Sequence, residues 1–374
     1  MRTLISLSFL PLFLLFTLAS SAASLRDIYV GQSVDLSGPL GYLGRDYVAG
    51  AKVYFDYINS RGGINGRKIV HLVQDNGGSA DKSAQISQEF LARQKVDVLF
   101  GYFGEGSLER LSGMAAFRQS GIPLVAPLSG LRVDNAVSHV YYIRPEYSVE
   151  AQKLVAYFTR KGVKRFAVVY AQDGYGRAAL QAVEAELKKN GITMEAGFAV
   201  GAGGEGMDKA IDGCRSKKPQ AVIMALQTLP AAQFVKAYRK YDQGSFLMGL
   251  SLINNETLFE FAGKDAAAGV MLSEVVPHPN DALVAVVAEH QRIMKIYRDE
   301  PPSHLTLEGF IAAKYLVSAM KNAGKNFTPA QLDFALAGTD IDLGGFFLAY
   351  AGDNRRGSSL VDVNVINRQG KLLN

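Results

Sequence analysis

The feature that most constrains this chain is an alternation of short β-type runs with amphipathic helical stretches, which begins at Ile28. The first helical stretch places Val48, Ala51, Phe55 and Ile58 on one face. Strands that alternate with helices form a parallel sheet covered on both faces, so the sequence predicts an α/β fold. The β-type runs occupy residues 28–34, 68–73, 96–102, 123–126, 165–170, 221–225 and 246–249.

The alternation occurs twice, which predicts two doubly wound parallel-sheet lobes. One run covers about residues 28–126, and a second begins at Arg165. The 374 residues are enough for two domains with cores of their own. Beyond Ser273 helical stretches are expected at 281–297, 305–323 and 328–337, followed by β-type runs at 345–350 and 360–366. Thr328 and Gln331 have the spacing of a capping box, with Pro329 at the first helical position.

The N-terminal segment differs from the rest of the chain. Arg2 precedes an apolar stretch over residues 4–18, and small residues follow near Ala22 and Ala23. This pattern predicts a cleaved secretory signal at residues 1–23 and a periplasmic location. The alternative, a membrane anchor, is disfavoured because the stretch is short and contains Pro11. We expect no stable membrane insertion of the mature chain.

The sequence lacks the catalytic, metal-binding and nucleotide-binding motifs that can be recognised by residue type and spacing. The sequence contains no G-x-S-x-G elbow, no H-E-x-x-H motif and no P-loop, and its five histidines lack the spacing of metal ligands. Cys214 is the sole cysteine, which excludes an intramolecular disulfide and a cysteine-based metal cluster. The net charge of +5 is spread among acidic residues and shows no basic run with interleaved aromatics. We therefore expect no catalytic residue, metal, cofactor or nucleic-acid partner.

Several stretches, in order along the chain, resemble one known family. They are residues 35–76, the segments VDVLFGYFGEGS and GIPLVAPLSG, residues 163–192, and the segments that begin KPQAVIMALQ and FLMGLSLINN. Together they are similar to the solute-binding proteins of branched-chain amino-acid (Leu/Ile/Val) ABC transporters, which have the type I periplasmic-binding fold. The likeness covers nearly the whole chain after residue 23.

The resemblance implies two lobes joined by three crossovers, with hinges near 143–147, 273–277 and 341–347. Lobe one would combine residues 25–143 with 277–341, and lobe two residues 147–273 with 347–374. The implied protein is a receptor, not an enzyme. It captures a small polar organic ligand (an amino acid or a related amide, amine or organic acid) and delivers it to an inner-membrane ABC permease. The alternative is a diffusible sensing module for a signalling or regulatory partner.

In the resembling family, two loops of lobe one hold the carboxylate of the ligand through hydroxyls and helix N-terminal N–H groups. Here these loops are Phe103–Ser107 and Leu128–Gly130. Ser129 is the candidate hydroxyl, with an ordinary turn cap as its alternative. Ser107 either contacts the ligand or caps the helix that begins near it, and Gly130 completes the second loop.

Two positions depart from the family pattern. Glu105 stands where the family more often has Ser or Thr, and a carboxylate there repels another carboxylate but attracts an amine. Its alternative is an exposed glutamate that stabilises the first turn of a helix. Ser251 stands where amino-acid binders commonly have an acid for the ligand ammonium. A neutral hydroxyl pairs poorly with a buried ammonium, so both departures weaken the amino-acid interpretation.

Aromatic and apolar side chains are expected to wall the site. Tyr42 and Leu43 lie in the first loop, and Phe103 lies in the second. Aromatic residues in such loops more often pack than bind, but Tyr175 lies between Gly174 and Gly176, which leave it little local packing. Tyr175 also matches a family aromatic that contacts the ligand. Gln227 and its neighbour Thr228 are further candidates for polar contacts from lobe two.

Overall fold

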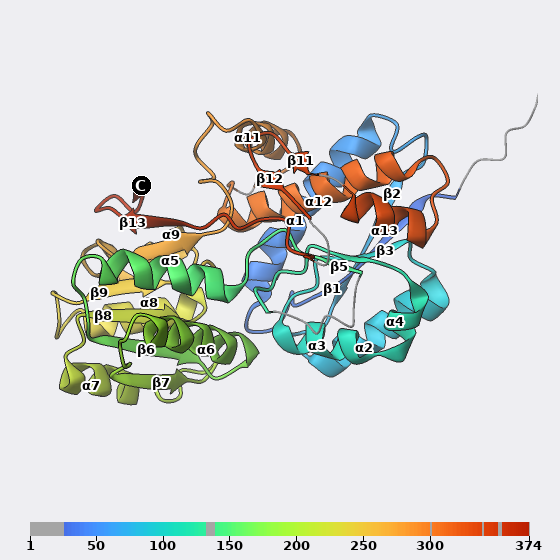
Figure 1. The fold of residues 1–374 in the computed structure, drawn as a ribbon. Helices are drawn as coiled ribbons and strands as arrows, with labels where there is room; N and C mark the ends of the chain where they lie inside the picture. The colour runs from blue at the N-terminus through green and yellow to red at the C-terminus, as the bar shows by residue number, and fades with distance from the viewer. Residues whose placement is uncertain (1–25, 132–138, 300, 339, 351–353, 374) are drawn as a thin grey trace, which may run out of the picture.

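The protein consists of two α/β lobes that lie side by side, as Figure 1 shows. The computed structural model describes residues 26–131, 139–299, 301–338, 340–350 and 354–373. The predicted secretory signal, residues 1–23, lies outside the described residues. The predicted fold class, two parallel-sheet lobes of the type I periplasmic-binding kind, is confirmed.

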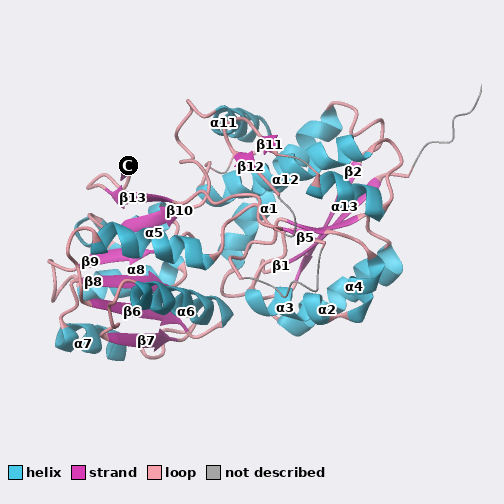
Figure 2. Cartoon of the chain, in the orientation of Figure 1, coloured by secondary structure: helices cyan, strands magenta, loops and turns pink. Residues whose placement is uncertain are grey.

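The sheet of lobe one has five parallel strands in the order β2-β1-β3-β4-β5 (Figure 2). Its second strand in that order, β1, pairs with β2 in a register that sets Ile28 opposite Ile69 and Val34 opposite Asp75. Strands β1 and β3 are buried almost throughout, as expected of strands covered on both faces, although β1 includes the polar residues Gln32 and Ser33. The strands are β1 (Ile28–Val34), β2 (Ile69–Asp75), β3 (Val98–Phe100), β4 (Leu124–Val125) and β5 (Val140–Tyr141).

Helices from two distant parts of the chain cover this sheet. The N-terminal part contributes α1 (Gly41–Ser60), α2 (Ala80–Glu89), the π-helix η1 (Phe90–Gln94), α3 (Glu105–Gly113) and α4 (Ala115–Ser120). The later part contributes α11 (Ala285–Tyr297), α12 (His304–Ala323) and α13 (Pro329–Ala337). Helices α1 and α12 pack with their backbones in contact. A Cβ at Gly50 would lie 1.8 Å from the Thr306 carbonyl oxygen, so the close approach requires glycine.

The sheet of lobe two is mixed and has seven strands in the order β14-β13-β10-β9-β8-β6-β7. Strands β6 to β10 are parallel to one another, whereas β13 pairs antiparallel with both β10 and β14. The strands are β6 (Phe166–Ala171), β7 (Ala196–Val200), β8 (Ala221–Ala225), β9 (Phe246–Gly249), β10 (Met271–Glu274), β13 (Asp362–Ile366) and β14 (Leu372–Leu373).

The helices of lobe two are α5 (Tyr147–Thr159), α6 (Gly174–Lys189), α7 (Met207–Lys217), α8 (Thr228–Tyr238), α9 (Asn255–Ala262) and α10 (Lys264–Ala267). Helix α5 packs on α6, and α8 packs on α9. Cys214 is buried on α7, and burial raises the pKa of its thiol to about 12, as expected of a packing residue. The glycine-rich segment 201–206 is the turn between β7 and α7.

The chain passes between the lobes three times. The first connection runs from β5 to α5, and the second from β10 to α11. A two-stranded ribbon of β11 (Ile341–Asp342) and β12 (Phe347–Leu348) precedes the third connection, which ends at β13. Tyr350 still lies against lobe one, because its ring stacks on Tyr315 of α12 with ring centroids 5.4 Å apart.

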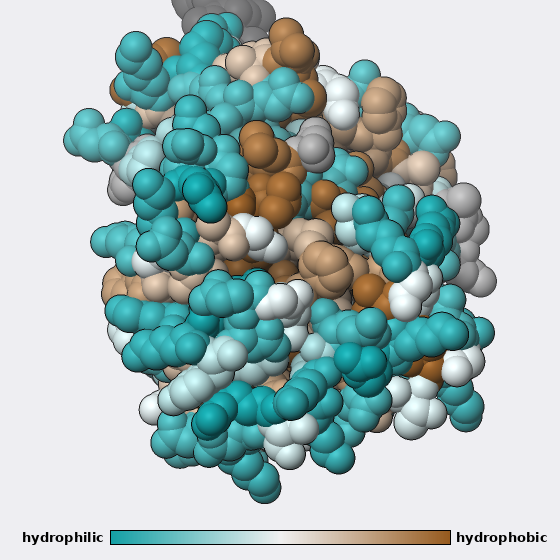
Figure 3. Space-filling view, turned by 90° about the vertical axis from the view of Figure 1, so that its left-hand side faces the viewer, coloured by the Kyte–Doolittle hydropathy of each residue, from teal (hydrophilic) through white to brown (hydrophobic). Residues whose placement is uncertain are grey.

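The surface is hydrophilic over most of the face drawn in Figure 3, with hydrophobic residues gathered near the middle of that view. Among the described residues no helix combines the length and the apolar character that a membrane crossing needs.

Candidate functional site

The candidate site lies between the lobes, and its first part surrounds Glu105. Glu105 is the first residue of α3 and is only 7% exposed, so it is not the exposed first-turn glutamate of the alternative interpretation. Its Oε1 accepts a hydrogen bond from Ser129 Oγ at 3.2 Å and another from the Tyr147 hydroxyl at 2.6 Å. Burial raises the pKa of Glu105, and the bond from Tyr147 opposes that rise. Protein hydroxyls therefore already bind this carboxylate.

Glycines let the two lobes approach one another at this point. A Cβ at Gly174, the first residue of α6, would lie 2.9 Å from the Cβ of Glu105. A Cβ at Gly130 would lie 2.6 Å from the Tyr147 ring. The Tyr147 ring in turn packs edge-on against Tyr175, with ring centroids 5.2 Å apart. Four of the candidates from the sequence, Glu105, Ser129, Gly130 and Tyr175, therefore lie around Tyr147, and their role as a ligand site stays a prediction.

A second group of buried polar side chains, here named the interlobe cluster, lies where the connections meet. It consists of Arg144, Glu150, Ser251, Ser273 and Glu308. Arg144 follows β5, and its Nη2 donates to Ser251 Oγ at 2.8 Å. Its Nε lies 3.2 Å from Glu308 Oε1 on α12, and the two side chains are 1% and 3% exposed. The cluster thus joins residues of both lobes.

Glu150 of α5 holds the lobe-two half of the interlobe cluster. Its Oε2 accepts from the Ser251 N–H at 2.9 Å and from Ser273 Oγ at 2.6 Å, and its Oε1 accepts from Ser251 Oγ at 3.0 Å. Ser251, proposed from the sequence as a ligand contact, is therefore bonded within the protein. The loop that contains Ser251 has no acidic residue of its own at this position, but Glu150 of α5 places a carboxylate beside Ser251.

Charge and burial compete within the interlobe cluster. Burial alone lowers the pKa of Arg144, but the carboxylates of Glu308 and Glu150 outweigh it, so its pKa is raised and the guanidinium stays charged. Burial raises the pKa of Glu308, although Arg144 opposes the rise. Removing one member would leave a buried charge without its partner, which typically costs several kcal/mol.

At the mouth of the interface, residues of both lobes line a hollow of about 230 Å³. Tyr42 of α1 reaches across it, and its hydroxyl accepts from the Thr228 N–H of α8 at 3.1 Å. Gln227 Nε2 donates to Asp173 Oδ2 at 2.7 Å, and Asp173 also caps α6 by accepting from the Gly176 N–H. Tyr42, Gln227 and Thr228 thus lie at the mouth rather than beside Glu105.

Three sequence-predicted residues lie apart from these polar groups. Leu43 is completely buried in the hydrophobic core, and Phe103 is buried there too, in a parallel bridge with Leu128. Ser107 lies inside the first turn of α3, whose N-cap is Gly104, so the expectation that Ser107 caps this helix is wrong.

Sequence reasoning missed Arg144, Tyr147, Glu150 and Glu308 as candidates. A usable signal existed for Arg144, because it interrupts the apolar segment Tyr141–Ile143 just where the chain leaves the first sheet. A charge in such a segment needs a partner. Glu308 gave a similar signal in the apolar helix α12, but nothing in the sequence pairs the two residues.

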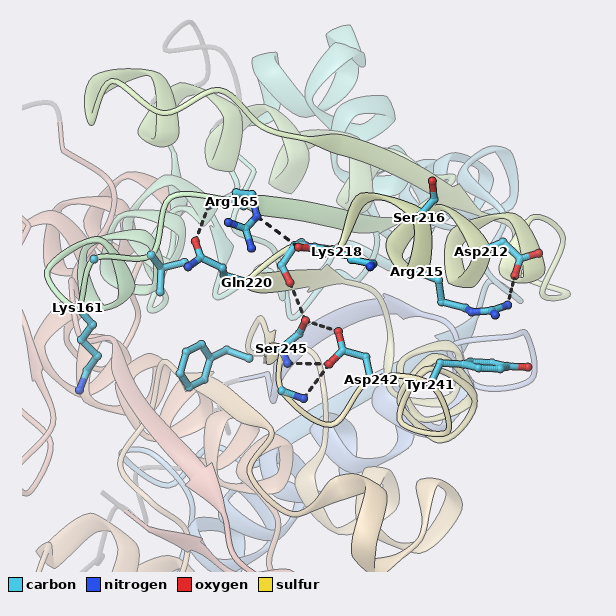
Figure 4. A pocket seen from close by; sticks show the side chains of 15 residues that line it. Lys161, Arg165, Asp212, Arg215, Ser216, Lys218, Gln220, Tyr241, Asp242 and Ser245 are labelled. Carbon is cyan, nitrogen blue, oxygen red and sulfur yellow. Dashed lines mark hydrogen bonds and ion pairs between the residues drawn. The ribbon is translucent and has the colours of Figure 1, made fainter.

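A larger hollow, of about 1020 Å³, lies at the opposite end of lobe two (Figure 4). It borders the starts of β6, β8 and β9, whereas ligands of open α/β sheets bind beyond the strand C-termini. Several of its charged groups have partners within the wall: Arg215 pairs with Asp212 at 3.0 Å, and Asp242 Oδ1 accepts from the Ser245 N–H at 3.0 Å (Figure 4). We therefore place the candidate site between the lobes.

Comparison with known proteins shows the family to which the chain belongs. The model of the family described as "Periplasmic binding protein" matches residues 27–371. The chain belongs to the periplasmic binding protein family. Among relatives of this binding protein is a Leu/Ile/Val-binding protein homolog 7 of Brucella suis, 24% identical over 350 residues that cover 89% of this chain and 86% of the relative.

Solved structures agree with the family. A substrate-binding periplasmic protein from Ralstonia solanacearum superposes with a TM-score of 0.88 at 30% identity, covering 93% of this chain and 99% of that one. A branched-chain amino acid ABC transporter protein from Thermus thermophilus, solved with bound valine, gives 0.86 at 18% identity, with 94% and 95% covered. At that identity the second likeness shows the fold of this binding protein alone.

Proposed function

We propose that this binding protein is an exported, non-enzymatic receptor that captures a small polar organic solute between its lobes and delivers it to an ABC permease. The observation that carries the proposal is the interface itself. Buried polar groups from both lobes meet there, and the Tyr42–Thr228 hydrogen bond joins its mouth. Ligand sites occur preferentially at domain interfaces and hold a small number of convergent polar groups, as this interface does.

The proposed contact residues are those that the interface gathers: Tyr42, Glu105, Ser129, Tyr175 and Gln227. We propose that the lobes turn on the connections near 143–147 and 273–277 and on a third connection that follows Tyr350, rather than at the 341–347 expected from the sequence, because Tyr350 still packs on lobe one. Ligand binding then favours the closed arrangement, because only that arrangement offers contacts from both lobes. The permease recognises the closed shape.

A ligand screen tests the proposal. The protein is unfolded, dialysed and refolded to remove bound molecules, and thermal shifts are recorded with amino acids, amides, polyamines, aromatic acids and urea. A binding compound is expected to reduce the radius of gyration in X-ray scattering and to stimulate ATP hydrolysis by the permease in proteoliposomes. Turnover of the compound, or binding without any compaction, would contradict a transport receptor.

A further inference from the structure

Two buried donors at the interface, Nη1 of Arg144 and the hydroxyl of Tyr175, have neither a hydrogen bond nor an ion pair among the described residues, and their residues are 1% and 2% exposed. Nε of Arg144 also lacks a hydrogen bond there, but it lies 3.2 Å from Glu308. The side chains of Arg144 and Tyr175 lie within electrostatic range of one another, although one belongs to the first connection and the other to α6 of lobe two. Buried donors are nearly always paired, so this combination needs an acceptor.

The direction of Arg144 is fixed by the protein. Its Nε faces Glu308 and its Nη2 is bonded to Ser251, so the planar guanidinium leaves Nη1 for a further acceptor. The Tyr175 ring is held by the edge-on contact with Tyr147. Turning either side chain away would break these contacts, so the protein holds both donors in place.

The charges around these donors disfavour the binding of an anionic ligand. Glu105, Glu150 and Glu308 are all buried at the interface. Arg144 faces two of them, and the other guanidinium within range, Arg356, pairs with Glu146 at 3.4 Å. Asp173 adds a further negative charge beside Glu105. A ligand carboxylate would therefore meet an excess of acidic groups at short range.

The carboxylate-binding position of lobe one is also occupied. Ser129 and Tyr147 donate to Glu105, so the hydroxyl that the family offers to a ligand carboxylate here serves a carboxylate of the chain itself. A donor group on the ligand could still approach Glu105, which is acidic and reaches the interface.

We propose that the ligand is an uncharged or cationic carbonyl compound, a primary amide in the simplest case, whose carbonyl oxygen accepts from Arg144 Nη1 and the Tyr175 hydroxyl. Its N–H groups face Glu105. This inference rests on the proposed function and names its substrate class.

Matched acid and amide pairs test this assignment. Acetate and acetamide, isovalerate and isovaleramide, benzoate and benzamide, and leucine and leucinamide are titrated by calorimetry into the refolded full-length mature protein. In the pairs that respond, the amide is expected to bind at least about tenfold more tightly than the acid. Tighter binding of the acids would overturn the assignment while leaving the receptor function intact.

The variant Tyr175→Phe separates ligand binding from folding, because it removes a hydroxyl that bonds nothing in the described protein. We expect about tenfold weaker binding of the amide and an unchanged melting temperature. The control Tyr238→Phe removes a lobe-two hydroxyl that bonds Asp242 at 2.8 Å, and it is expected to lower the melting temperature and spare affinity. Unchanged amide affinity in Tyr175→Phe would overturn the assignment.

A final arm covers compounds outside these pairs. The refolded protein is incubated with a small-molecule extract, washed and denatured, and the released molecule is identified by mass spectrometry. A neutral or cationic carbonyl compound supports the assignment. An anion or a compound without a carbonyl overturns the assignment but leaves the receptor function intact. Release of no molecule at all, with no response to any pair, overturns the receptor function together with this inference.

Discussion

Single side chains at the interface decide which groups the loop after β3 binds. Glu105 begins α3 and turns inward, where Ser129 and Tyr147 bind it. Its position on a helix N-terminus was readable from the sequence, but its direction was not, because burial depends on the hydroxyls that other segments bring to it. The same holds for Ser251, whose partner Glu150 comes from a different helix.

Buried histidines set the response of the protein to acid, and His290 is the clearest of them. It is completely buried on α11, its two ring nitrogens have no partner among the described residues, and burial lowers its pKa from 6.5 to about 4. Below pH 6.5 the unfolded chain takes up a proton that the folded protein refuses until about pH 4. The contribution of His290 to the free energy of unfolding therefore falls as the pH falls through that window.

The variant His290→Leu removes this titration. Between about pH 8 and pH 5, wild type is expected to lose about 2 kcal/mol more unfolding free energy than the variant. The reason is that each pH unit below the unfolded pKa of 6.5 costs about 1.4 kcal/mol. Urea denaturation at each pH measures the difference. Parallel pH profiles for the two proteins would show that His290 is protonated, or hydrated, in the folded state.

Among elements, the long helices were the most predictable and the short strands the least. The capping box of Thr328 and Gln331 is present, and α13 starts at Pro329 as the sequence indicates. Strand β5 has two residues and β7 has five, and neither range is among the expected β-type runs, although both are mainly apolar. Apolar runs this short do not by themselves distinguish a strand from a buried part of a helix.

The packing of α1 on α12 was beyond sequence reasoning, because the helices are far apart in the chain. Gly309 allows this close packing, because a Cβ there would lie 2.1 Å from the carbonyl oxygen of Tyr47.

Gly309→Ala is expected to lower the unfolding free energy by about 1–3 kcal/mol, since the backbone would have to move. Gly113→Ala, at the end of α3 with nothing within 4 Å of the added atom, is the control and is expected to be neutral or slightly stabilising. Chemical denaturation of both variants and of wild type measures the difference. Equal unfolding free energies for Gly309→Ala and wild type would mean that α12 shifts on α1 at little cost.

At the scale of the whole molecule, two lobes could be predicted because the strand–helix alternation repeats. The interlobe cluster could not, since its five residues come from separate segments that meet only after the chain has crossed between lobes. A charged residue such as Arg144 in an apolar segment indicates that a partner exists, but only the assembled structure identifies Glu308 as that partner. The arrangement of the cluster is thus a property of the assembled molecule.

Closure itself can be tested at Tyr42, whose hydroxyl accepts from the Thr228 N–H of the other lobe at 3.1 Å. Because this bond exists only while the lobes touch, its loss in Tyr42→Phe penalises the closed state and spares the fold of each lobe. We expect about five- to tenfold weaker affinity for the compound that binds best in the screen, with faster dissociation, since a lost hydrogen bond is worth about 1 kcal/mol or slightly more.

The matched control is Tyr102→Phe, which removes a hydroxyl that shares a 2.8 Å hydrogen bond with Ser87 inside lobe one. That variant is expected to melt earlier than wild type and to bind normally, because both partners move together when the lobes open. The opposite pattern, with Tyr42→Phe losing melting temperature and keeping its affinity, would mean that the Tyr42–Thr228 bond stabilises the folded chain in every state. The energy that holds the lobes together would then have to reside in the interlobe cluster, where Arg144 of the first connection pairs with Glu308 of lobe one and donates to Ser251 of lobe two.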